Sequence, residues 1–434
     1  MFSYTHIILL TSCFANLVLA KSHSPNCTLP PDNSNYVAGV NVRSTLDIFW
    51  SAIYTVFVCT WAVQHLNVPP PKASTPDFHW WQFWKIKIPA FFWTRLKWML
   101  LTIIMPEYLL GAALSGYVAA RKFKKYTKEP GSKGERWTTT HGYYADMGGL
   151  VYTLPETPGN FEPRLVAINS KQLRYLLDKG FLDQEPPMSE DEILDKSKGD
   201  AFATISAVVQ LLWLVTQLIT RKVLKLPSSQ LEILALAFAV CTSFTYILNY
   251  PKPQNIQVPS HVSNLQRNQR ASQSYFKNAL WPWEDKKELE AIIRNDKLNP
   301  SSQLKILNEG KSYEWIVDAD SIGFITGAVI LGLCHCIAWN FQFPTPIERL
   351  LWRIASVGIT GILPLFYFLW FMLTYGSDHL GKLYDYLQLP LSYISFSVYV
   401  VARLYLLVAP FRELFYLPPE AFIATWSVSL PYFG

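Results

Sequence analysis

The chain has 434 residues, of which half are hydrophobic and only 16% are charged, with a formal net charge of +6. Soluble proteins carry about 25% charged residues, and the apolar residues here gather in long uninterrupted runs, which excludes a soluble enzyme. A run of about 18 or more nearly uncharged residues matches the hydrocarbon core of a bilayer. The positive charge lies beside these runs, where it suits anionic lipid headgroups rather than nucleic acid. We therefore expect an all-α integral membrane protein, a bundle of about seven transmembrane helices with two long polar loops.

The first 20 residues have a short apolar core that ends in Val18-Leu19-Ala20. This small-x-small ending predicts a signal peptide cleaved after Ala20, and an uncleaved extra span is the alternative. Asn26-Cys27-Thr28 is a glycosylation sequon with Asn26 as the acceptor. Both features place residues 21–43, the amino-terminal segment, in the lumen of the endoplasmic reticulum or outside the cell.

From residue 44 onward, apolar runs alternate with polar connections. We expect spans one and two in 44–120, a long polar loop at 121–201, spans three and four in 202–250, a second polar loop at 251–320, spans five to seven in 321–409, and a tail at 410–434. The predicted helices are Thr45–Leu66, Trp98–Ala120, Ala203–Thr220, Ile233–Leu248, Ile322–Ala338, Leu351–Leu373 and Leu389–Val408.

The distribution of basic residues predicts how these spans are oriented. With a lumenal amino terminus and seven spans, segments 67–97, 221–230 and 341–350 face the cytosol, and their surplus of Lys and Arg agrees with the positive-inside rule. A basic run at 121–125 argues the other way. Both long loops would then be lumenal, although neither contains a sequon. The expected location is the membrane of the endoplasmic reticulum or another endomembrane.

Glu107 is the clearest polar group within a predicted span. An ionisable residue at lipid depth is costly, so it is a functional hypothesis by default. Pro106 directly before it frees a backbone carbonyl and kinks the helix, and Gly111 and Ser115 continue a face of small residues along which another helix can approach closely. A carboxyl group there is expected to keep its proton and to act as a proton donor. The alternative is a carboxyl that only bonds a neighbouring helix.

The first span carries a polar stripe. Asp47, Ser51, Thr55 and Cys59 recur at intervals of four, so they share one side of the helix and are expected to face the bundle interior. His65 and Asn67 close the other end of the span. Asp47 and His65 are about 27 Å apart at 1.5 Å per residue, so they cannot belong to one site. Asp47 is the candidate acid for a lumenal reaction centre and His65 for a cytosolic one, and a helix cap is the equally open interpretation of Asp47.

The first long loop contains an unusual segment from Trp137 to Gly149. His141 and Asp146 can both move protons, and Gly148-Gly149 permits close backbone approach. Such a loop folded against the membrane would place these groups over a cavity, whereas the alternative is a structural turn with a capping Asp. Cys334-His335-Cys336 points its side chains in different directions on one helix, so no metal is expected there. No other cofactor motif is found.

Four segments carry a resemblance to a known family. They are Arg43-Ser44-Thr45-Leu46-Asp47, His65-Leu66-Asn67-Val68-Pro69, Trp137 to Gly149, and Phe411-Arg412-Glu413 up to Pro419. In this order they resemble a fungal family of multi-pass membrane proteins that includes the membrane-bound terpene cyclases of ascochlorin and ascofuranone meroterpenoid biosynthesis. Ser44 and Tyr143-Tyr144 depart from the family pattern. The resemblance does not identify catalytic residues.

This resemblance implies metal-independent cyclisation of a farnesyl chain, often epoxidised and attached to an aromatic group. The reaction needs a Brønsted acid, a dry cavity and aromatic faces that stabilise carbocations. No cofactor is expected, and the partners are the lipid bilayer and an isoprenoid substrate. A transporter or receptor for a hydrophobic molecule and a non-catalytic structural protein are the alternatives, although the chain lacks the paired repeats of many transporters. The candidate catalytic residues are Glu107, Asp47, His141, Asp146 and His65, and the candidate substrate-binding residues are Trp50, Tyr54, Trp61, Asn67 and Arg403.

Overall fold

The structure is a computed structural model. It describes residues 35–37, 42–69, 90–127, 136–154, 164–178, 186–262, 319–375 and 378–425. The predicted signal peptide, Asn26 and most of the second long loop lie outside the described residues. Six of the described helices are long and apolar enough to cross a membrane, or seven if one bent pair is counted as a span. This arrangement is compatible with a membrane protein.

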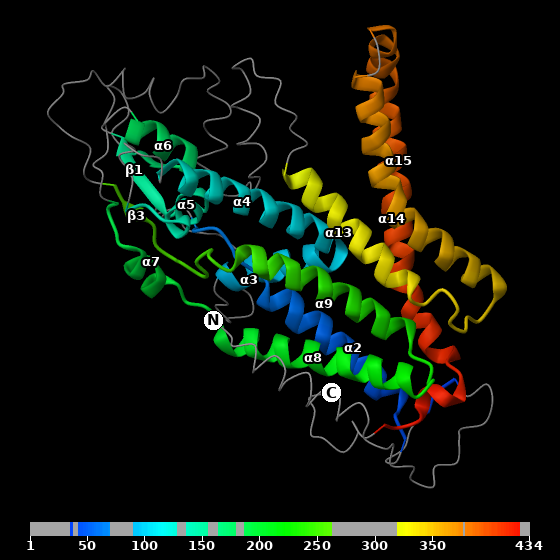
Figure 1. Cartoon of the computed structure of the whole chain (residues 1–434). Helices are drawn as coiled ribbons and strands as arrows, with labels where there is room; N and C mark the ends of the chain where they lie inside the picture. The colour runs from blue at the N-terminus through cyan, green and yellow to red at the C-terminus, as the bar shows by residue number, and fades with distance from the viewer. Residues whose placement is uncertain are drawn as a thin grey trace, which may run out of the picture.

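A body of long helices makes up most of the molecule (Figure 1). The helices of the body begin where their sequences supply caps: Ser44 and Ser229 each accept a hydrogen bond from the third residue of the following helix and form capping boxes. The body consists of α2 (Thr45–Ala62), α3 (Ala90–Ile104), α4 (Pro106–Thr127), α8 (Ala201–Val223), α9 (Gln230–Asn249), α13 (Ala319–Cys336), α14 (Pro346–Tyr375) and α15 (Asp378–Glu413), followed by the 3-10 helices η2 (Leu414–Tyr416) and η3 (Pro419–Phe422).

The pair formed by α3 and α4 bends by 110° at the break before Pro106. Proline has no N–H and disfavours a helical conformation in the residue before it, so one helix ends and another begins there. Arg95, in the second turn of α3, donates to the carbonyl of Trp61 at 3.2 Å, and Val68 donates to the carbonyl of Met147, beyond α4, at 2.9 Å. The pair therefore enters and leaves at one end of the body, as a re-entrant hairpin.

The body has two ends, which we call the cap end and the tail end. The cap end comprises residues 63–69, 136–154, 164–178, 186–200 and 250–262, joined by bonds such as that from Lys198 N to Gln254 O at 3.0 Å. The tail end comprises residues 42–44, 224–229, 337–345 and 414–425. There Arg43 pairs with Glu232 and donates its backbone N–H to Phe422 at 3.0 Å. Each of α2, α8 and α9 runs between the two ends.

Helix α13 runs along α4 to the tail end, and α14 and α15 begin and end there. Gly323 and Gly327 of α13 pack against Gly111 and Glu107 of α4 respectively, so α13 runs antiparallel to α4, towards the tail end. There Gln342 accepts a bond from Gln230 at 2.6 Å. Helices α14 and α15 then form an antiparallel hairpin that returns to the tail end (Figure 1). The six spans leave residues 42–44 and 414–425 at the same end.

This arrangement corrects the predicted orientation. Segments 67–97 and 221–230 were expected on one side of the membrane, but residue 67 lies at the cap end and 224–229 at the tail end. The reason is that α3 and α4, expected together as the crossing span Trp98–Ala120, turn back instead of crossing.

A small folded cap covers the cap end. It contains α5 (Thr139–Asp146), β1 (Leu150–Leu154), β2 (Arg164–Ala167), α6 (Ser170–Asp178), α7 (Glu190–Lys196) and β3 (Ser260–His261). The sheet has the order β2-β1-β3, with β1 antiparallel to β2 and parallel to β3. The cap has its own core, which includes Trp137, Tyr144, Leu150, Leu173 and Ile193. The segment expected as a polar loop at 121–201 is therefore largely folded, and the protein is mainly but not entirely α-helical.

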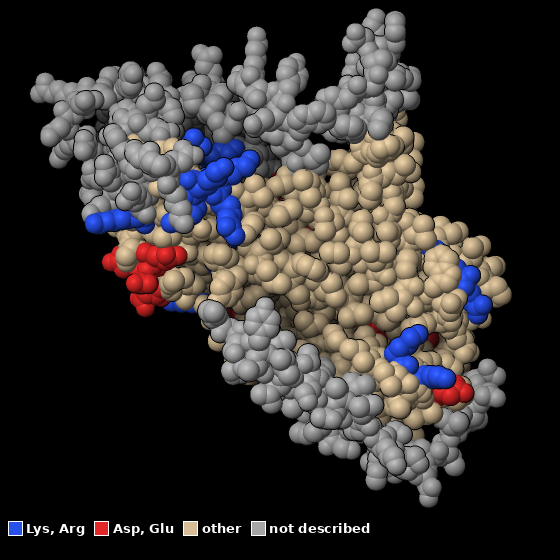
Figure 2. Space-filling model, in the orientation of Figure 1, with Lys and Arg blue, Asp and Glu red and all other residues tan. Residues whose placement is uncertain are grey.

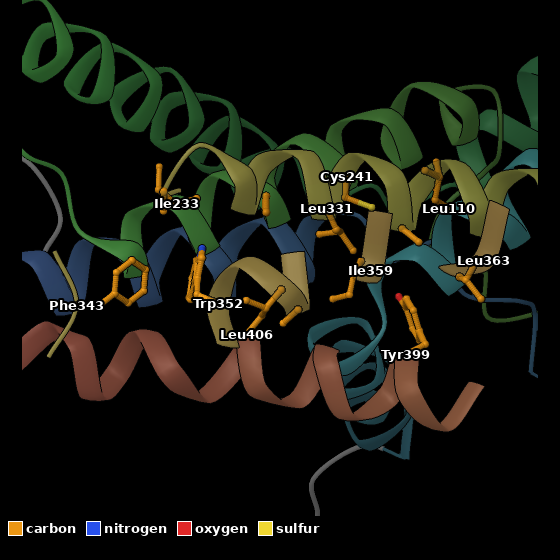
Figure 3. Packing of buried hydrophobic residues seen from close by; sticks show 14 residues of the cluster. Leu110, Ile233, Cys241, Leu331, Phe343, Trp352, Ile359, Leu363, Tyr399 and Leu406 are labelled. Carbon is orange, nitrogen blue, oxygen red and sulfur yellow. The ribbon is translucent and has the colours of Figure 1, made fainter. Parts of the chain in front are cut away.

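Small residues let the body helices pack closely. A Cβ placed on Gly323 would lie 2.7 Å from the Cα of Gly111, so the backbones of α4 and α13 nearly touch. The predicted small-residue face of Gly111 is thus confirmed, with α13 as its partner. Figure 3 shows the core beside this contact, where Leu331, Trp352, Tyr399 and Leu406 come together from α13, α14 and α15.

Charged residues gather at the two ends of the molecule, and the body between them is nearly free of charge on the visible face (Figure 2). Lys122 and Lys125 are exposed near the end of α4, and α7 begins with the acidic residues Glu190, Asp191 and Glu192. Large apolar side chains are exposed on the body, for example Phe202 at 80% and Ile247 at 66%. Apolar exposure on this scale fits a surface that faces lipid.

Candidate functional site

A cavity of about 100 Å³ lies at the cap end, between α4 and the cap. Its two walls differ in chemistry. The apolar wall comprises Trp98 of α3 and, from α4, Tyr108, Leu109, Ala112, Ala113, Gly116 and Ala119, with Ser115 among them. The polar wall comprises Gln64, His65 and Asn67 after α2, Asp146 at the end of α5, Asn169, Ser170 and Lys171 at the start of α6, and Asn249 and Lys252 after α9, with the apolar side chains of Leu66, Tyr143 and Met147 among them.

The apolar wall follows from the sequence of α4. Leu109, Ala112, Gly116 and Ala119 recur at intervals of three or four, so they share one face of the helix. Their small side chains leave the space that forms the cavity. Gly116 marks its narrow part, because a Cβ there would lie 3.4 Å from the ring of Tyr143.

Asp146 is the carboxyl group of the polar wall. The backbone N–H of Ser170 donates to its Oδ1 at 2.8 Å and the Ser170 hydroxyl to its Oδ2 at 2.9 Å, so Asp146 caps the amino end of α6. Burial raises the pKa of Asp146, while the bonds from Ser170 and the charges of Lys171 and Lys252 act in the opposite direction. The net effect of burial is to favour the protonated form of this carboxyl group more than water would.

His65 is held as a neutral imidazole. Burial lowers its pKa to about 4, and the charges of Lys252 and Arg95 add to that effect. Its Nδ1 lies 3.0 Å from the carbonyl of Val63 and its Nε2 lies 2.7 Å from the amide nitrogen of Gln254. The Nδ1–H therefore donates to Val63, and Nε2 accepts from Gln254. Because both ring nitrogens are hydrogen-bonded, His65 has a structural role in the polar wall and is not placed to transfer protons.

Lys252 is a cavity residue that the sequence interpretation missed, because residues 251–320 were read as a polar linker. Pro251 and Pro253 flank Lys252 and restrict the backbone there. They are the only local feature of the sequence that indicates an ordered position for this lysine. Burial lowers the pKa of Lys252 to about 8, and the charge of Asp146 works against that shift. Among the described residues, the Lys252 ammonium makes no ion pair or hydrogen bond.

The turn after α5 brings Asp146 to the cavity. Gly148 has a φ of 80°, which only glycine adopts readily. A side chain on Gly149 would collide with the ring of Tyr144, 2.1 Å from its built Cβ. The close approach predicted for Gly148-Gly149 is thus confirmed. The capping role expected for Asp146 is also observed, and it does not prevent this residue from facing the cavity.

Glu107 does not line the cavity. It is fully buried between α4, α13 and α15, where the hydroxyl of Tyr399 donates to its Oε1. Nearby, the guanidinium of Arg403 donates to the carbonyls of Ile104 at 3.2 Å and Ile103 at 3.5 Å. These carbonyls precede the break between α3 and α4, and irregular backbone at membrane depth needs such partners. Glu107 and Arg403 therefore stabilise the re-entrant hairpin, which is the bonding role that the sequence left open for Glu107.

Asp47 and His141 also serve local structure. Asp47 accepts from the N–H of Ser44 at 2.8 Å and completes the cap of α2, at the tail end. His141 lies in the cap, with its Nε2 2.9 Å from the carbonyl of Met188 and its Nδ1 2.8 Å from the hydroxyl of Thr138. Neither residue reaches the cavity.

The aromatic candidates of the first span lie away from the cavity. Trp50 is 52% exposed on the outer face of α2. Trp61 stacks on Phe57, with the guanidinium of Arg95 4.3 Å from its ring centre. Tyr54 is half-buried on the same helix. Of the predicted site residues, the structure therefore brings together His65, Asn67 and Asp146.

The polar stripe of α2 faces the interior as predicted. Ser51 and Thr55 are buried, and the side-chain amide of Gln210 on α8 donates to the Thr55 hydroxyl at 3.0 Å. The stripe thus joins two helices, and it does not extend to the cavity.

Comparison with known proteins yields a family without a function. Residues 13–274, more than half of the chain, match the model of a family of unknown function (DUF8562). The match includes α2 to α9, the re-entrant hairpin, the cap and therefore all the cavity residues. No curated protein and no solved structure matches the chain.

Proposed function

The chain belongs to that family of unknown function, DUF8562, and we propose that it is a membrane-embedded terpene cyclase whose site is the cavity between α4 and the cap. One observation carries the proposal: an apolar wall of small residues on α4 faces a polar wall that contains the carboxyl group of Asp146. The resemblance of its sequence motifs to meroterpenoid cyclases supplies the reaction class. The substrate is then an aromatic molecule with a farnesyl chain that ends in an epoxide.

Asp146 is the acid in this proposal. Its protonated carboxyl group donates to the epoxide oxygen, the C–O bond breaks, and the nearest double bond attacks the cationic carbon to form a ring. The last cation loses a proton from carbon, which restores an alkene and returns a proton to the site. The net reaction is an isomerisation and needs no oxidant or reductant. The rings of Trp98, Tyr108 and Tyr143 line the cavity and offer faces to the intermediate cations.

Asp146 replaces Glu107 and Asp47 as the leading acid for structural reasons. Glu107 is bonded to Tyr399 outside the cavity, and Asp47 caps a helix at the tail end. A proton donor must come within hydrogen-bond reach of the reacting atom. Asp146 is the described carboxyl group that lines the cavity.

The test is conversion of a farnesylated phenol with a terminal epoxide by membranes that contain the protein. Asp146→Asn is expected to lower the cyclisation rate by at least about 100-fold, since acid–base catalysis contributes about 10² to 10⁴. Asp191→Asn is the matched control, because Asp191 is an exposed carboxyl group of α7 that does not line the cavity. It is expected to retain most of the activity.

Filling the cavity gives an independent test that leaves the acid unchanged. Gly116→Leu places a side chain in the narrow part of the cavity and is expected to abolish cyclisation. Gly358→Leu is its control, because nothing lies within 4 Å of a Cβ at that position on α14. Undiminished cyclisation by Asp146→Asn, at normal abundance in membranes, would overturn the proposal. Binding without turnover in the unmodified protein would favour a receptor or transporter.

A further inference from the structure

The cavity holds more positive than negative charge. Lys171 and Lys252 line it together with one carboxyl group, Asp146. Each carboxylate oxygen of Asp146 already accepts one hydrogen bond from Ser170. His65 is neutral and contributes no charge. The charge of Lys252 is therefore only partly balanced by the described groups that face it, which are Asp146 from α5 and His65 after α2.

The imbalance grows if Asp146 acts as an acid. A protonated Asp146 is neutral and leaves the half-buried Lys252 without a counter-charge among the described residues, which is unfavourable for a partly desolvated ammonium group. The amino end of α6, at residues 169–171, adds the positive end of a helix dipole on the same wall. An anionic group of the substrate would remove this cost.

A second observation comes from the opposite wall. Ser115 of α4 lines the cavity, is 1% exposed, and its hydroxyl has no hydrogen-bond partner among the described residues. A serine within a helix commonly bonds the carbonyl four residues earlier. A buried hydroxyl without a partner is rare in native structures and calls for an explanation, for which a bound ligand is the simplest.

We infer that the cavity binds an amphiphilic acid, with its carboxylate or phenolate beside Lys252 and its isoprenoid chain folded back along the small residues of α4, so that the far end of the chain returns to Asp146. Asn67 and Asn249 lie on the same polar wall and supply amide donors. The inference rests on the proposed function and adds the class of headgroup to it. The position fits an amphiphile, because the apolar wall belongs to the membrane body and the polar wall to the cap.

Binding is measured separately from turnover. The purified full chain in nanodiscs of phosphatidylcholine is titrated with a farnesylated hydroxybenzoic acid and with its methyl ester, and binding is followed by quenching of tryptophan fluorescence, since Trp98 lines the cavity. The acid is expected to bind about tenfold more tightly than the ester, which corresponds to about 1.4 kcal/mol. Empty nanodiscs report the contribution of the lipid.

Variants at Lys252 give the decisive comparison. Lys252→Gln is expected to bind acid and ester equally, whereas Lys252→Arg keeps the preference for the acid. Lys198→Gln is the matched control, because Lys198 is an exposed lysine of the cap that does not line the cavity. Equal binding of acid and ester by the unmodified protein, or a preference that survives in Lys252→Gln, overturns the inference.

Asp146→Asn distinguishes this inference from the proposed function. It is expected to bind the acid at least as tightly as the unmodified protein, because it removes a negative charge, while it loses cyclisation. A clear preference for the acid without any cyclisation would support the headgroup site and refute the cyclase. Cyclisation without a preference for the acid would do the reverse.

Discussion

The body and the cap differ in which side chains they bury and which they expose. On the body, apolar side chains face outward, such as Phe202 and Ile247, and polar ones such as Thr55 are buried. In the cap, Trp137 and Leu150 are buried in a core, and the acidic residues of α7 face outward. The two surfaces suit lipid and water respectively. The cavity lies where the regions meet, and this explains why one of its walls is apolar and the other polar.

The two regions also use buried charge differently. In the body, Arg221 donates to the carbonyls of Pro227, Ala421 and Ile423, Arg403 donates to the α3 carbonyls, and Arg43 pairs with Glu232. These charges hold chain segments together. At the boundary with the cap, Lys252 is unpaired among the described residues. These buried charges of the body are therefore structural, whereas Lys252 is the charge that we propose meets a ligand.

The largest expected effect concerns the two ends of the body. Cysteines introduced at one end should be labelled from one side of the membrane only, and cysteines at the other end only from the opposite side. Lys125→Cys and Lys198→Cys, at the cap end, are expected to react with a membrane-impermeant maleimide from one side of sealed vesicles. Lys225→Cys and Arg349→Cys, at the tail end, are expected to react only from the other side. All four positions are exposed. The reactivity of the unmodified protein, with its own cysteines, is the baseline.

With a lumenal amino terminus, this arrangement places the cap end in the cytosol. That assignment agrees with the basic run at 121–125 and with the lack of sequons in both long connections. Labelling of Pro69→Cys and Lys125→Cys from opposite sides would contradict the re-entrant hairpin and restore the seven-span prediction, in which a span separates these two positions.

Removing a structural charge of the body should cost more stability than any single change in the cap. Arg221→Ala deletes hydrogen bonds to four carbonyls, those of Pro227, Glu420, Ala421 and Ile423, and frees the segment after α15. Since breaking a buried charged network costs about 3 to 5 kcal/mol, we expect a large fall in the melting temperature in detergent. Lys222→Ala, at an exposed neighbouring position, is expected to change it little. A similar small change for Arg221→Ala would show that the network is dispensable.

A single methyl group added at the contact between α4 and α13 should lower the stability of the protein. A Cβ on Gly327 would lie 2.7 Å from the Cβ of Glu107, so Gly327→Ala is expected to lose about 1 to 3 kcal/mol through overpacking. Gly361→Ala on α14 is its control, with nothing within 4 Å, and is expected to stay within about 0.5 kcal/mol. Thermal unfolding in detergent measures both, and equal stabilities would refute the close contact of α4 and α13.

The smallest expected effect is the pH dependence of ligand binding at the boundary. The pKa of Lys252 is about 8, so the ammonium loses its proton as the pH rises from 7 to 9. Affinity for an anionic amphiphile should therefore fall several-fold across that range. His65, with a pKa of about 4, stays neutral throughout. Titrations at a series of pH values check this, and Lys252→Arg should remove the step because arginine keeps its charge. A step that persists in Lys252→Arg would assign it to another group.

The sequence by itself determined the class of protein and the approximate spans. The expected helices Ala203–Thr220 and Ile233–Leu248 lie within α8 and α9, and Ser229 marks the start of α9. Hydropathy and helix caps are properties of neighbouring residues, so they can be read without knowing the fold. For the same local reason, His65 and Asp146 could be selected as polar groups of interest.

Only the tertiary structure decided which polar groups share a site. Glu107 was the leading candidate acid in the sequence and Asp146 a secondary one, but contacts with Tyr399 on α15 and with Ser170 on α6 give them different roles. The reversal between α3 and α4 likewise depends on Arg403, about 300 residues away along the chain. Hydropathy shows how apolar a segment is, but not which distant residue bonds its free carbonyls. Contacts between residues far apart in the sequence therefore hold the hairpin, join the cap to the body and form the cavity.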